Sequence, residues 1–327
     1  MRENLIIAVI IVLTACVSMS GREAQAAQNA SLIKAQVLTI ANTQRTYDLY
    51  VPQTLTQKPV PLLLLFHGHG GDSDVMTGEN HKAAPYKVWL TLADKNQFII
   101  AIPNGTAGAD GWLGWNDCRA DATTNPHSDD LGFIAALVQQ LTHDYPIDSR
   151  RIYASGTSNG GHMVLRLAME LSGTFAAVAP VVAAMPLHNK CKQPEHSISV
   201  LFMNGTEDPF SPFDGGKMGK DKYERGEVLS TPASVGYWIK HNGVSENPAV
   251  KEFPNRSRRD SSRVVRESYA DGNQGPEVVL YKVIGGGHTE PSIKEKYGMI
   301  YRLIVGNQNH DVEMANEIWE FLQNKRR

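Results

Sequence analysis

The stretch RIYASGTSNGGHM, residues 151–163, decides the fold. A short β-branched and aromatic run ends at Ala154, and an apolar helical pattern begins at Met163. Between the two, Ser158 stands with a glycine two positions away on each side, Gly156 and Gly160. This order predicts a strand, a sharp turn and a helix, with the serine at the turn.

Two interpretations of Ser158 are open on this motif alone. In a nucleophile elbow the serine occupies a strained turn, and flanking glycines are needed because a Cβ would collide with the neighbouring strand and helix. The same pattern also arises by chance where a serine simply ends a strand. The phosphate-binding lysine and glycine spacing of P-loops and Rossmann loops are missing from this motif, which favours the elbow.

The amino terminus is typical of an export signal. Residues 5–15 are almost wholly apolar, follow a short segment with Arg2, and are too few to span a bilayer. Cleavage after Ala26 would remove a signal peptide, residues 1–26. A lipobox at residues 13–16 would instead leave Cys16 as a lipidated amino terminus after loss of residues 1–15. The first route predicts a periplasmic or extracellular protein, and the second predicts attachment to the membrane of the cell envelope.

The composition fits one large globular domain behind this leader. The chain has 327 residues, 42% of them hydrophobic, and a net charge of -2, so no charge excess points to nucleic acid. The arginine-rich residues 255–266 lack aromatics and are expected to form a solvated face. We expect residues 27–40 to be a flexible segment and residues 41–327 to form a single catalytic domain.

Patterns of buried strands and helices alternate along this domain. Residues 60–66 contain four consecutive leucines and predict a central strand buried on both faces. Further strands are expected at residues 45–51, 98–103, 176–182, 199–203 and 278–283. Helices are expected at residues 83–95, after an N-cap at Ser128, from Thr231 to Gly243, and at 312–322. This alternation predicts an α/β fold with a mostly parallel central sheet and helices on both faces.

A glycine-rich turn, HGHGGD at residues 67–72, follows the leucine strand. Glycines there let a backbone N–H turn towards a substrate, so we expect the N–H groups of His69 and Asn159 to form an oxyanion hole. The two histidines and Asp72 also suggest a dinuclear metal site. Asp72 stands one position late for that signature and no histidine follows it, so we expect no metal.

The loop at residues 105–127, called the aromatic loop below, has an aromatic centre, GWLGWNDC, that contains Trp112 and Trp115. Such loops often line a binding pocket, although tryptophans packed over the base of the loop are the alternative. Cys118 in this loop and Cys191 are the cysteines of the predicted domain, in a compartment that permits oxidation. We expect a disulfide between them. Two buried thiols are the alternative, and no C-x-x-C or H-x-x-x-H spacing indicates metal ligands.

An acid and a base follow two later strands. Asp208 comes after the strand at residues 199–203, and His288 follows three glycines after the strand at residues 278–283. In open parallel sheets the working residues lie at the carboxyl ends of the strands, so both are placed at the correct edge. Glu207 and Asp214 are alternative acids. The order Ser158, Asp208, His288 is the one that α/β hydrolases use.

From about Arg45 to Phe321 the chain resembles the secreted α/β-hydrolase esterases of the poly(3-hydroxybutyrate) depolymerase and feruloyl or acetylxylan esterase family. The resemblance rests on several motifs in one order: HGHGG at 67–71, the W-N-x-C loop, SDDLGF at 128–133, GTSNGG at 156–161, GTEDP at 205–209 with DGG at 214–216, and GGGHT at 285–289. It implies Ser158 as nucleophile, Asp208 as acid and His288 as base. Members often carry tryptophan where this chain has Glu290, and V-P-Y where it has residues 211–213, so we expect Glu290 to flank the substrate pocket.

These observations predict an exported serine esterase that needs no metal or organic cofactor. His288 would take the Ser158 proton, the alkoxide would attack the ester carbonyl, and water would resolve the acyl-enzyme. The substrate is expected to be a hydroxyalkanoate, feruloyl or acetyl ester, either small or polymeric. A serine peptidase on the same scaffold and a non-catalytic polymer-binding lipoprotein are the alternatives.

Overall fold

A computed structural model describes the chain except for residues 1–31, 57, 80–84, 220–222 and 272–274. The predicted signal peptide and Cys16 therefore lie outside the described residues. Within the described part, no helix has both the length and the apolar character that crossing a membrane requires.

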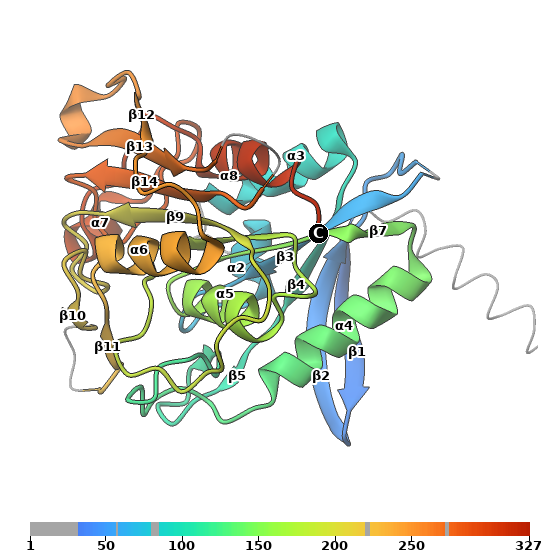
Figure 1. The fold of residues 1–327 in the computed structure, drawn as a ribbon. Coiled ribbons are helices and arrows are strands. Elements are labelled where there is room, and N and C mark those ends of the chain that lie inside the picture. Colours follow the sequence, from blue (N-terminus) through green and yellow to red (C-terminus); the bar gives the residue numbers. More distant parts are fainter. Residues whose placement is uncertain (1–31, 57, 80–84, 220–222, 272–274) are drawn as a thin grey trace, which may run out of the picture.

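A ten-stranded sheet runs through the centre of the molecule in the order β1-β2-β4-β3-β7-β8-β9-β14-β13-β12 (Figure 1). Neighbouring strands from β4 to β14 are parallel, and antiparallel strands extend the sheet at both edges. The strands are β1 (Leu32–Ile40), β2 (Thr43–Tyr50), β3 (Val60–Phe66), β4 (Ile99–Pro103), β7 (Ile147–Thr157), β8 (Ala177–Val181), β9 (Ser199–Gly205), β12 (Ala249–Glu252), β13 (Arg263–Tyr269) and β14 (Val278–Ile284). Short pairs lie outside it: β5 (Thr106–Ala107) with β6 (Leu113–Gly114), and β10 (Gly216–Lys217) with β11 (Glu227–Val228).

Helices cover both faces of the sheet. The helical segments are α2 (Ser73–Thr77), η1 (Pro85–Lys87), α3 (Val88–Asn96), α4 (Asp130–Asp144), α5 (Asn159–Glu170), α6 (Thr231–Asn242), η2 (Arg258–Asp260), α7 (Met299–Val305) and α8 (Met314–Leu322). Residues of α4, α5 and α6 form one hydrophobic core with the sheet, and residues of α3 and α8 form the other. The predicted α/β fold with helices on both faces is confirmed.

The leucine strand β3 shows why this arrangement is stable. Leu62 and Leu64 belong to the core beneath α4, α5 and α6, whereas Leu63 and Leu65 belong to the core beneath α3 and α8. All four are fully buried. Because successive side chains of a strand point to opposite faces, only a strand covered on both sides can bury a continuous apolar run.

The prediction that residues 27–40 are flexible is wrong for Leu32–Ile40, which form the edge strand β1. This strand pairs antiparallel with β2, from Leu32 opposite Tyr50 to Ile40 opposite Thr43. The Ala35 N–H also donates to the Asp48 carboxylate across 2.8 Å. Strand β1 is therefore part of the central sheet.

The structure also differs from the sequence predictions at the cap of α4, in the segment 255–266 and at helix α7. Helix α4 is capped by Asp129, whose carboxylate accepts the Gly132 N–H at 2.9 Å, and not by Ser128. The segment 255–266, expected only as a solvated face, contains η2 and the beginning of β13. Helix α7 was not predicted, because its apolar residues follow no amphipathic pattern in the sequence. In the structure most of these side chains are exposed.

Candidate active site

Ser158 lies at a sharp turn between β7 and α5, as predicted. Its φ of 53° and ψ of -121° are strained for a residue with a side chain. The flanking glycines are required by close packing: a Cβ on Gly160 would lie 2.3 Å from the main-chain oxygen of Phe66, and one on Gly156 would lie 2.7 Å from Gly160. The turn presents Ser158 at the amino terminus of α5, where the helix dipole favours negative charge.

Asp208 and His288 form a directly hydrogen-bonded pair. His288 Nδ1 lies 2.7 Å from Asp208 Oδ2. The other carboxylate oxygen of Asp208 accepts the N–H groups of Phe210 and Ser211, both at 2.8 Å. Asp208 Oδ2 can then accept only if Nδ1 carries the proton, which leaves His288 Nε2 as the basic nitrogen.

The loops after β9 and β14 are fastened to each other and to α7. The Glu207 N–H donates to the Gly286 carbonyl at 2.9 Å, and the Gly285 N–H donates to the Thr206 hydroxyl at 2.9 Å. The His288 N–H donates to the Val305 carbonyl at the end of α7, at 2.6 Å. Because β7, β9 and β14 are parallel members of one sheet, Ser158, Asp208 and His288 all lie at its carboxyl edge.

The surroundings of His288 act on its pKa in opposite directions. Burial lowers the pKa of His288, while the Asp208 carboxylate and then the charge of Glu290 raise it, and the net shift is upwards from 6.5. The side chain is 13% exposed, so the imidazole remains reachable from the sheet edge. A histidine with these partners can accept a proton near neutral pH and hold it as a stabilised imidazolium.

The predicted oxyanion donors lie beside the elbow. Asn159 is the first residue of α5, and the N–H groups of a first helical turn have no acceptor within the helix. His69 belongs to the turn after β3, where the Gly70 N–H donates to the Leu113 carbonyl at 2.7 Å. Its imidazole Nε2 lies 3.0 Å from Asp110, and burial lowers its pKa. The His69 ring is therefore paired with Asp110 of the aromatic loop, and the oxyanion role of its main-chain N–H stays a prediction.

His67, the other histidine of this turn, supports the fold. It is fully buried, its Nε2 accepts the Gly105 N–H at 3.0 Å, and its Nδ1 therefore donates to the Gly68 carbonyl at 2.8 Å. Burial lowers the pKa of His67 to about 4, so the ring stays neutral. Both nitrogens are committed to backbone groups, and neither points to a metal.

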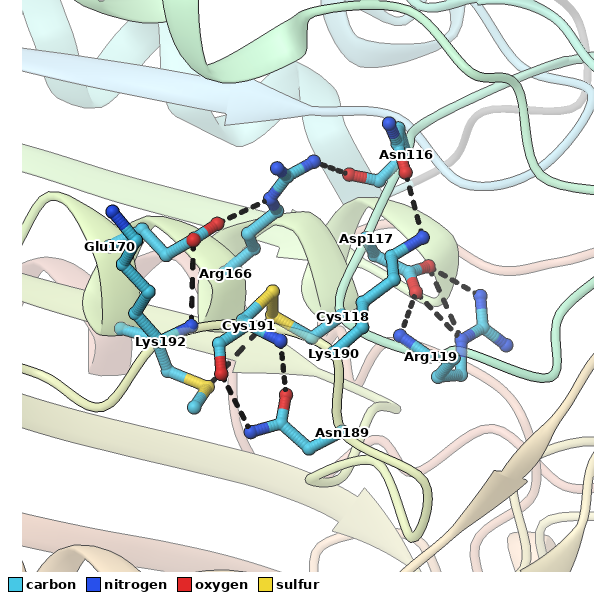
Figure 2. The surroundings of a disulfide bond; sticks show 11 residues. Asn116, Asp117, Cys118, Arg119, Arg166, Glu170, Asn189, Lys190, Cys191 and Lys192 are labelled. Carbon is cyan, nitrogen blue, oxygen red and sulfur yellow. Dashed lines mark hydrogen bonds and ion pairs between the residues drawn. A yellow bond between two sulfur atoms is a disulfide. The ribbon is translucent and has the colours of Figure 1, made fainter.

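Cys118 and Cys191 form the predicted disulfide, with their Cα atoms 5.2 Å apart (Figure 2). Neighbouring contacts fasten the same two segments: Lys190 Nζ donates to Asn116 Oδ1 at 2.9 Å, and the Lys190 N–H donates to the Cys118 carbonyl at 3.0 Å. Arg166 of α5 donates to the Asn116 carbonyl. The aromatic loop is thus bound to α5 and to the segment after β8.

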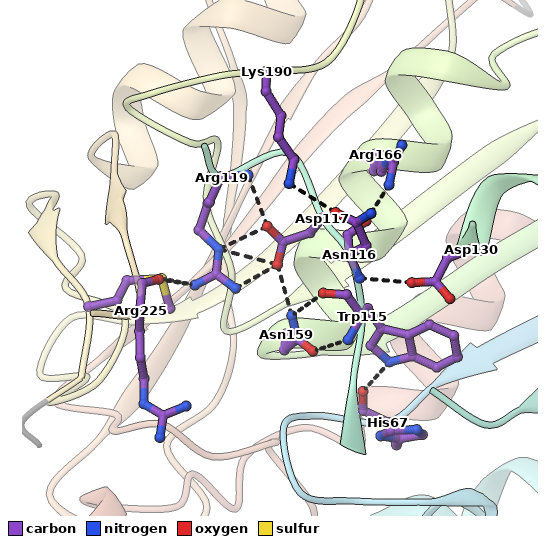
Figure 3. Close-up of polar contacts among 11 residues, drawn as sticks. His67, Trp115, Asn116, Asp117, Arg119, Asp130, Asn159, Arg166, Lys190 and Arg225 are labelled. Carbon is purple, nitrogen blue, oxygen red and sulfur yellow. Dashed lines mark hydrogen bonds and ion pairs between the residues drawn. The ribbon is translucent and has the colours of Figure 1, made fainter. Parts of the chain in front are cut away.

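The Asn159 side chain joins this loop to the elbow (Figure 3). Its Oδ1 accepts the Trp115 N–H at 2.7 Å, and its Nδ2 donates to Asp117 Oδ2 at 2.8 Å. Asp117 is buried and paired with Arg119, which donates to both of its carboxylate oxygens. Burial raises the pKa of Asp117, but Arg119 outweighs it and the pKa falls to about 2. Sequence patterns gave no indication of this network.

The two tryptophans of the loop differ, and the pocket prediction is wrong for Trp115. Trp115 is fully buried, packs edge-on against Phe66 at 5.1 Å between ring centroids, and donates its indole N–H to the His67 carbonyl at 2.9 Å. It is a core residue of the loop base, which was the alternative interpretation. Trp112 is 61% exposed, and a Cβ built on Gly70, in the turn after β3, would lie 3.6 Å from its ring. Trp112 remains the candidate for a pocket wall.

Glu290 also does not line an open pocket. It is 5% exposed, and its carboxylate accepts hydrogen bonds from the hydroxyls of Tyr86, Thr157 and Tyr297. Tyr86 is separated from Glu290 by 204 positions in the sequence, so no local pattern could have revealed the contact. Thr157 is also distant, at 133 positions, whereas Tyr297 is only 7 positions away; sequence reasoning missed all three donors.

Several of the proteins to which the chain is similar are named esterases. The chain is 30% identical over 299 residues to the putative esterase NocK of Nocardia uniformis subsp. tsuyamanensis, covering 88% of this chain and 82% of that protein. It is 29% identical over 220 residues to a probable feruloyl esterase C of Aspergillus flavus, covering 66% and 73%. The solved acetyl xylan esterase from Aspergillus awamori superposes with a TM-score of 0.55 at 15% identity, covering 90% of this chain and 100% of that one. The prolyl oligopeptidase family matches residues 87–213.

Proposed function

The chain belongs to the α/β-hydrolase esterase family, and on that premise we propose that it cleaves carboxylic esters with Ser158, His288 and Asp208. The observation that carries the proposal is the 2.7 Å contact of His288 Nδ1 with Asp208, at the same sheet edge as the strained Ser158 turn. A serine, an imidazole and a carboxylate in these roles form the common machinery of acyl transfer.

The chemistry follows from the proton positions. His288 Nε2 takes the proton of Ser158 as the hydroxyl attacks the ester carbonyl, and the imidazolium is stabilised by Asp208. The N–H groups of Asn159 and His69 hold the developing oxyanion. His288 then gives its proton to the leaving alcohol, and a water molecule activated by the same ring releases the acid from Ser158. No metal or organic cofactor takes part in this scheme.

Hydroxyalkanoate, feruloyl and acetyl esters are the substrate classes proposed. The names of the relatives support feruloyl and acetyl esters, and the exposed Trp112 beside the oxyanion turn offers a flat apolar wall for an acyl group. A side-by-side assay of p-nitrophenyl acetate, methyl ferulate, acetylated xylan and short hydroxybutyrate oligomers would identify the class.

The experiment that tests the proposal is covalent labelling with a fluorophosphonate. Intact-mass analysis should show one adduct, and peptide mapping should locate it on Ser158. The Ser158→Ala variant should take up no label while keeping its circular dichroism spectrum. An adduct on another residue, or an unlabelled wild type, would contradict the proposed nucleophile, and the second result would favour a non-catalytic binding protein.

Peptide cleavage is a second candidate, because the prolyl oligopeptidase family matches residues 87–213. That segment contains Ser158 and Asp208 but ends before His288. Prolyl p-nitroanilides and p-nitrophenyl esters with the same acyl group distinguish the two activities. An esterase should favour the ester by several orders of magnitude, whereas comparable kcat/KM values would favour the peptidase.

Export is proposed from the apolar leader at residues 5–15. Either Cys16 is lipidated and anchors the enzyme to the envelope, or cleavage after Ala26 releases it. Radiolabelled palmitate in a bacterial host separates the routes. Label that is lost in Cys16→Ser supports the anchor, and an unlabelled protein that begins at Ala27 supports release.

A further inference from the structure

Glu290 is a buried carboxylate beside the proposed triad but not part of it. It stands two positions after His288 and is 5% exposed. Hydroxyl groups from three separate segments donate to it: Tyr86 of η1, Thr157 at the end of β7, and Tyr297 before α7. A carboxylate withdrawn from water in this way is costly unless its oxygens are satisfied, and these donors satisfy them.

The direction of these hydrogen bonds is fixed. Burial, and then the charge of Glu290, raise the pKa of Tyr86 and of Tyr297 well above 10, so both phenols keep their protons and donate. Gln308 holds the same loop from the other side, since its side-chain amide donates to the Glu290 carbonyl at 3.0 Å and accepts the Tyr297 N–H at 2.8 Å. The carboxylate is therefore fixed in one position.

Thr157 makes this cluster relevant to the reaction. It immediately precedes Ser158, and its hydroxyl donates to Glu290 Oε1. One carboxylate thus connects the residue next to the proposed nucleophile with the loop that carries the proposed base. This buried contact therefore links the two segments directly.

We propose that Glu290 is a positioning residue for ester hydrolysis: it holds the His288 loop against the elbow through Thr157, and its charge stabilises the imidazolium that forms during proton transfer. The inference rests on the proposed roles of Ser158 and His288. It adds a second carboxylate to the proposed machinery, one that touches neither substrate nor the reacting atoms.

Other titratable groups also lie around His288 and Glu290, and their effects on His288 must be distinguished from the effect of Glu290. Asp208 faces the imidazole from the loop after β9. His162 of α5 interacts electrostatically with His288, and burial, with Arg119 next, lowers the pKa of His162 to about 3, so that ring is neutral. Tyr301 of α7 packs on Tyr297 at 4.9 Å between ring centroids, and burial raises its pKa to about 12. Among these groups Asp208 and Glu290 are the two carboxylates, and each raises the pKa of His288.

The test measures the rate of fluorophosphonate labelling of Ser158 against pH in Glu290→Gln. Loss of the charge should move the rising limb of the profile to lower pH by roughly half a unit to one unit, less than a carboxylate in direct contact would give. The plateau rate should fall roughly threefold to tenfold because the loop is held less firmly. Glu295→Gln makes the same change in charge and shape in a side chain outside the cluster, and should reproduce the wild-type profile.

The outcomes separate this inference from the proposed function. A wild type that takes no label on Ser158 would overturn the proposed function. A labelled wild type whose profile is unchanged by Glu290→Gln would overturn the inference alone.

If Glu290→Gln does not fold, a second variant, Thr157→Val, tests the positioning role. Thr157→Val keeps the shape of the side chain and the charge of Glu290 but removes the hydroxyl. It should lower the plateau rate about threefold to tenfold with the limb near its wild-type position, and Thr157→Ser should restore the rate. Equal rates in Thr157→Val and the wild type would contradict the positioning role.

Discussion

Asn159 Nδ2 lies 2.8 Å from Asp117 Oδ2, so the residue that follows the Ser158 turn is bound by its side chain to the aromatic loop. The same side chain accepts the Trp115 N–H. Asn159 is thereby held in place by a buried network. This contact joins the two halves of the site, because the loop also packs against the turn that carries His69.

The first prediction follows from this network. Asp117→Ala leaves the Arg119 guanidinium buried without its carboxylate, so it should lower the free energy of unfolding by about 3–5 kcal/mol. Urea unfolding measures this loss. Asp74→Ala, which removes one partner of the exposed Lys34 ion pair, is the control and should cost less than about 1 kcal/mol. Equal losses in the two variants would show that the buried pair does not stabilise the loop.

The second prediction separates the two loop tryptophans. Trp115→Ala removes a fully buried indole and should destabilise the protein by about 3–5 kcal/mol. Trp112→Ala removes an exposed ring beside the oxyanion turn, so it should leave the unfolding midpoint in place and raise KM more than it lowers kcat. Thermal unfolding and ester kinetics on both variants provide the comparison. A large loss of stability in Trp112→Ala, with KM unchanged, would place that ring in the core.

The third prediction concerns the disulfide, which closes a separation of 73 positions. Because the cross-link restricts the unfolded chain, the Cys118→Ser/Cys191→Ser double variant should lose about 2–4 kcal/mol of unfolding free energy. Urea midpoints of the wild type with and without reductant should show the same difference. Midpoints that are insensitive to reductant, with two thiols titrated in the untreated unfolded protein, would exclude the bond.

The fourth prediction concerns pH. His288 acts as a base only when neutral, and its pKa is raised above 6.5, so kcat/KM should rise through an apparent pKa at or above that value and then level off. Asp208→Asn removes the larger of the two charges that raise the pKa of His288, while burial still lowers it, so the rising limb of the profile should move to lower pH. The plateau should fall on the order of 10³–10⁴-fold. A limb that stays in place in Asp208→Asn would assign the profile to another group.

Local patterns were enough to predict the elements that carry the proposed triad. The glycines on either side of Ser158 are recognisable by their spacing alone, although Phe66, which requires Gly160, is distant in the sequence. The apolar strands before Asp208 and His288 have a composition that only burial on both faces explains. The disulfide was predictable because few cysteines were available to pair.

The features that the sequence did not predict depend on partners that are distant along the chain. Strand β1 is half exposed and polar along one side, and its stability comes from the backbone of β2. The donors to Glu290 come from η1, β7 and the segment before α7, and only the folded sheet edge brings them together. The resemblance to the esterase family drew attention to Glu290 but gave no reason for the residue.

The central claim is that Ser158 is the nucleophile of an acyl-enzyme mechanism, and the kinetics of Ser158→Ala test it most directly. With p-nitrophenyl acetate as substrate and the fold checked by circular dichroism, kcat/KM should fall by about 10⁴–10⁶-fold, since the triad acts as a unit. A folded Ser158→Ala protein that kept a tenth or more of the wild-type kcat/KM would contradict the claim.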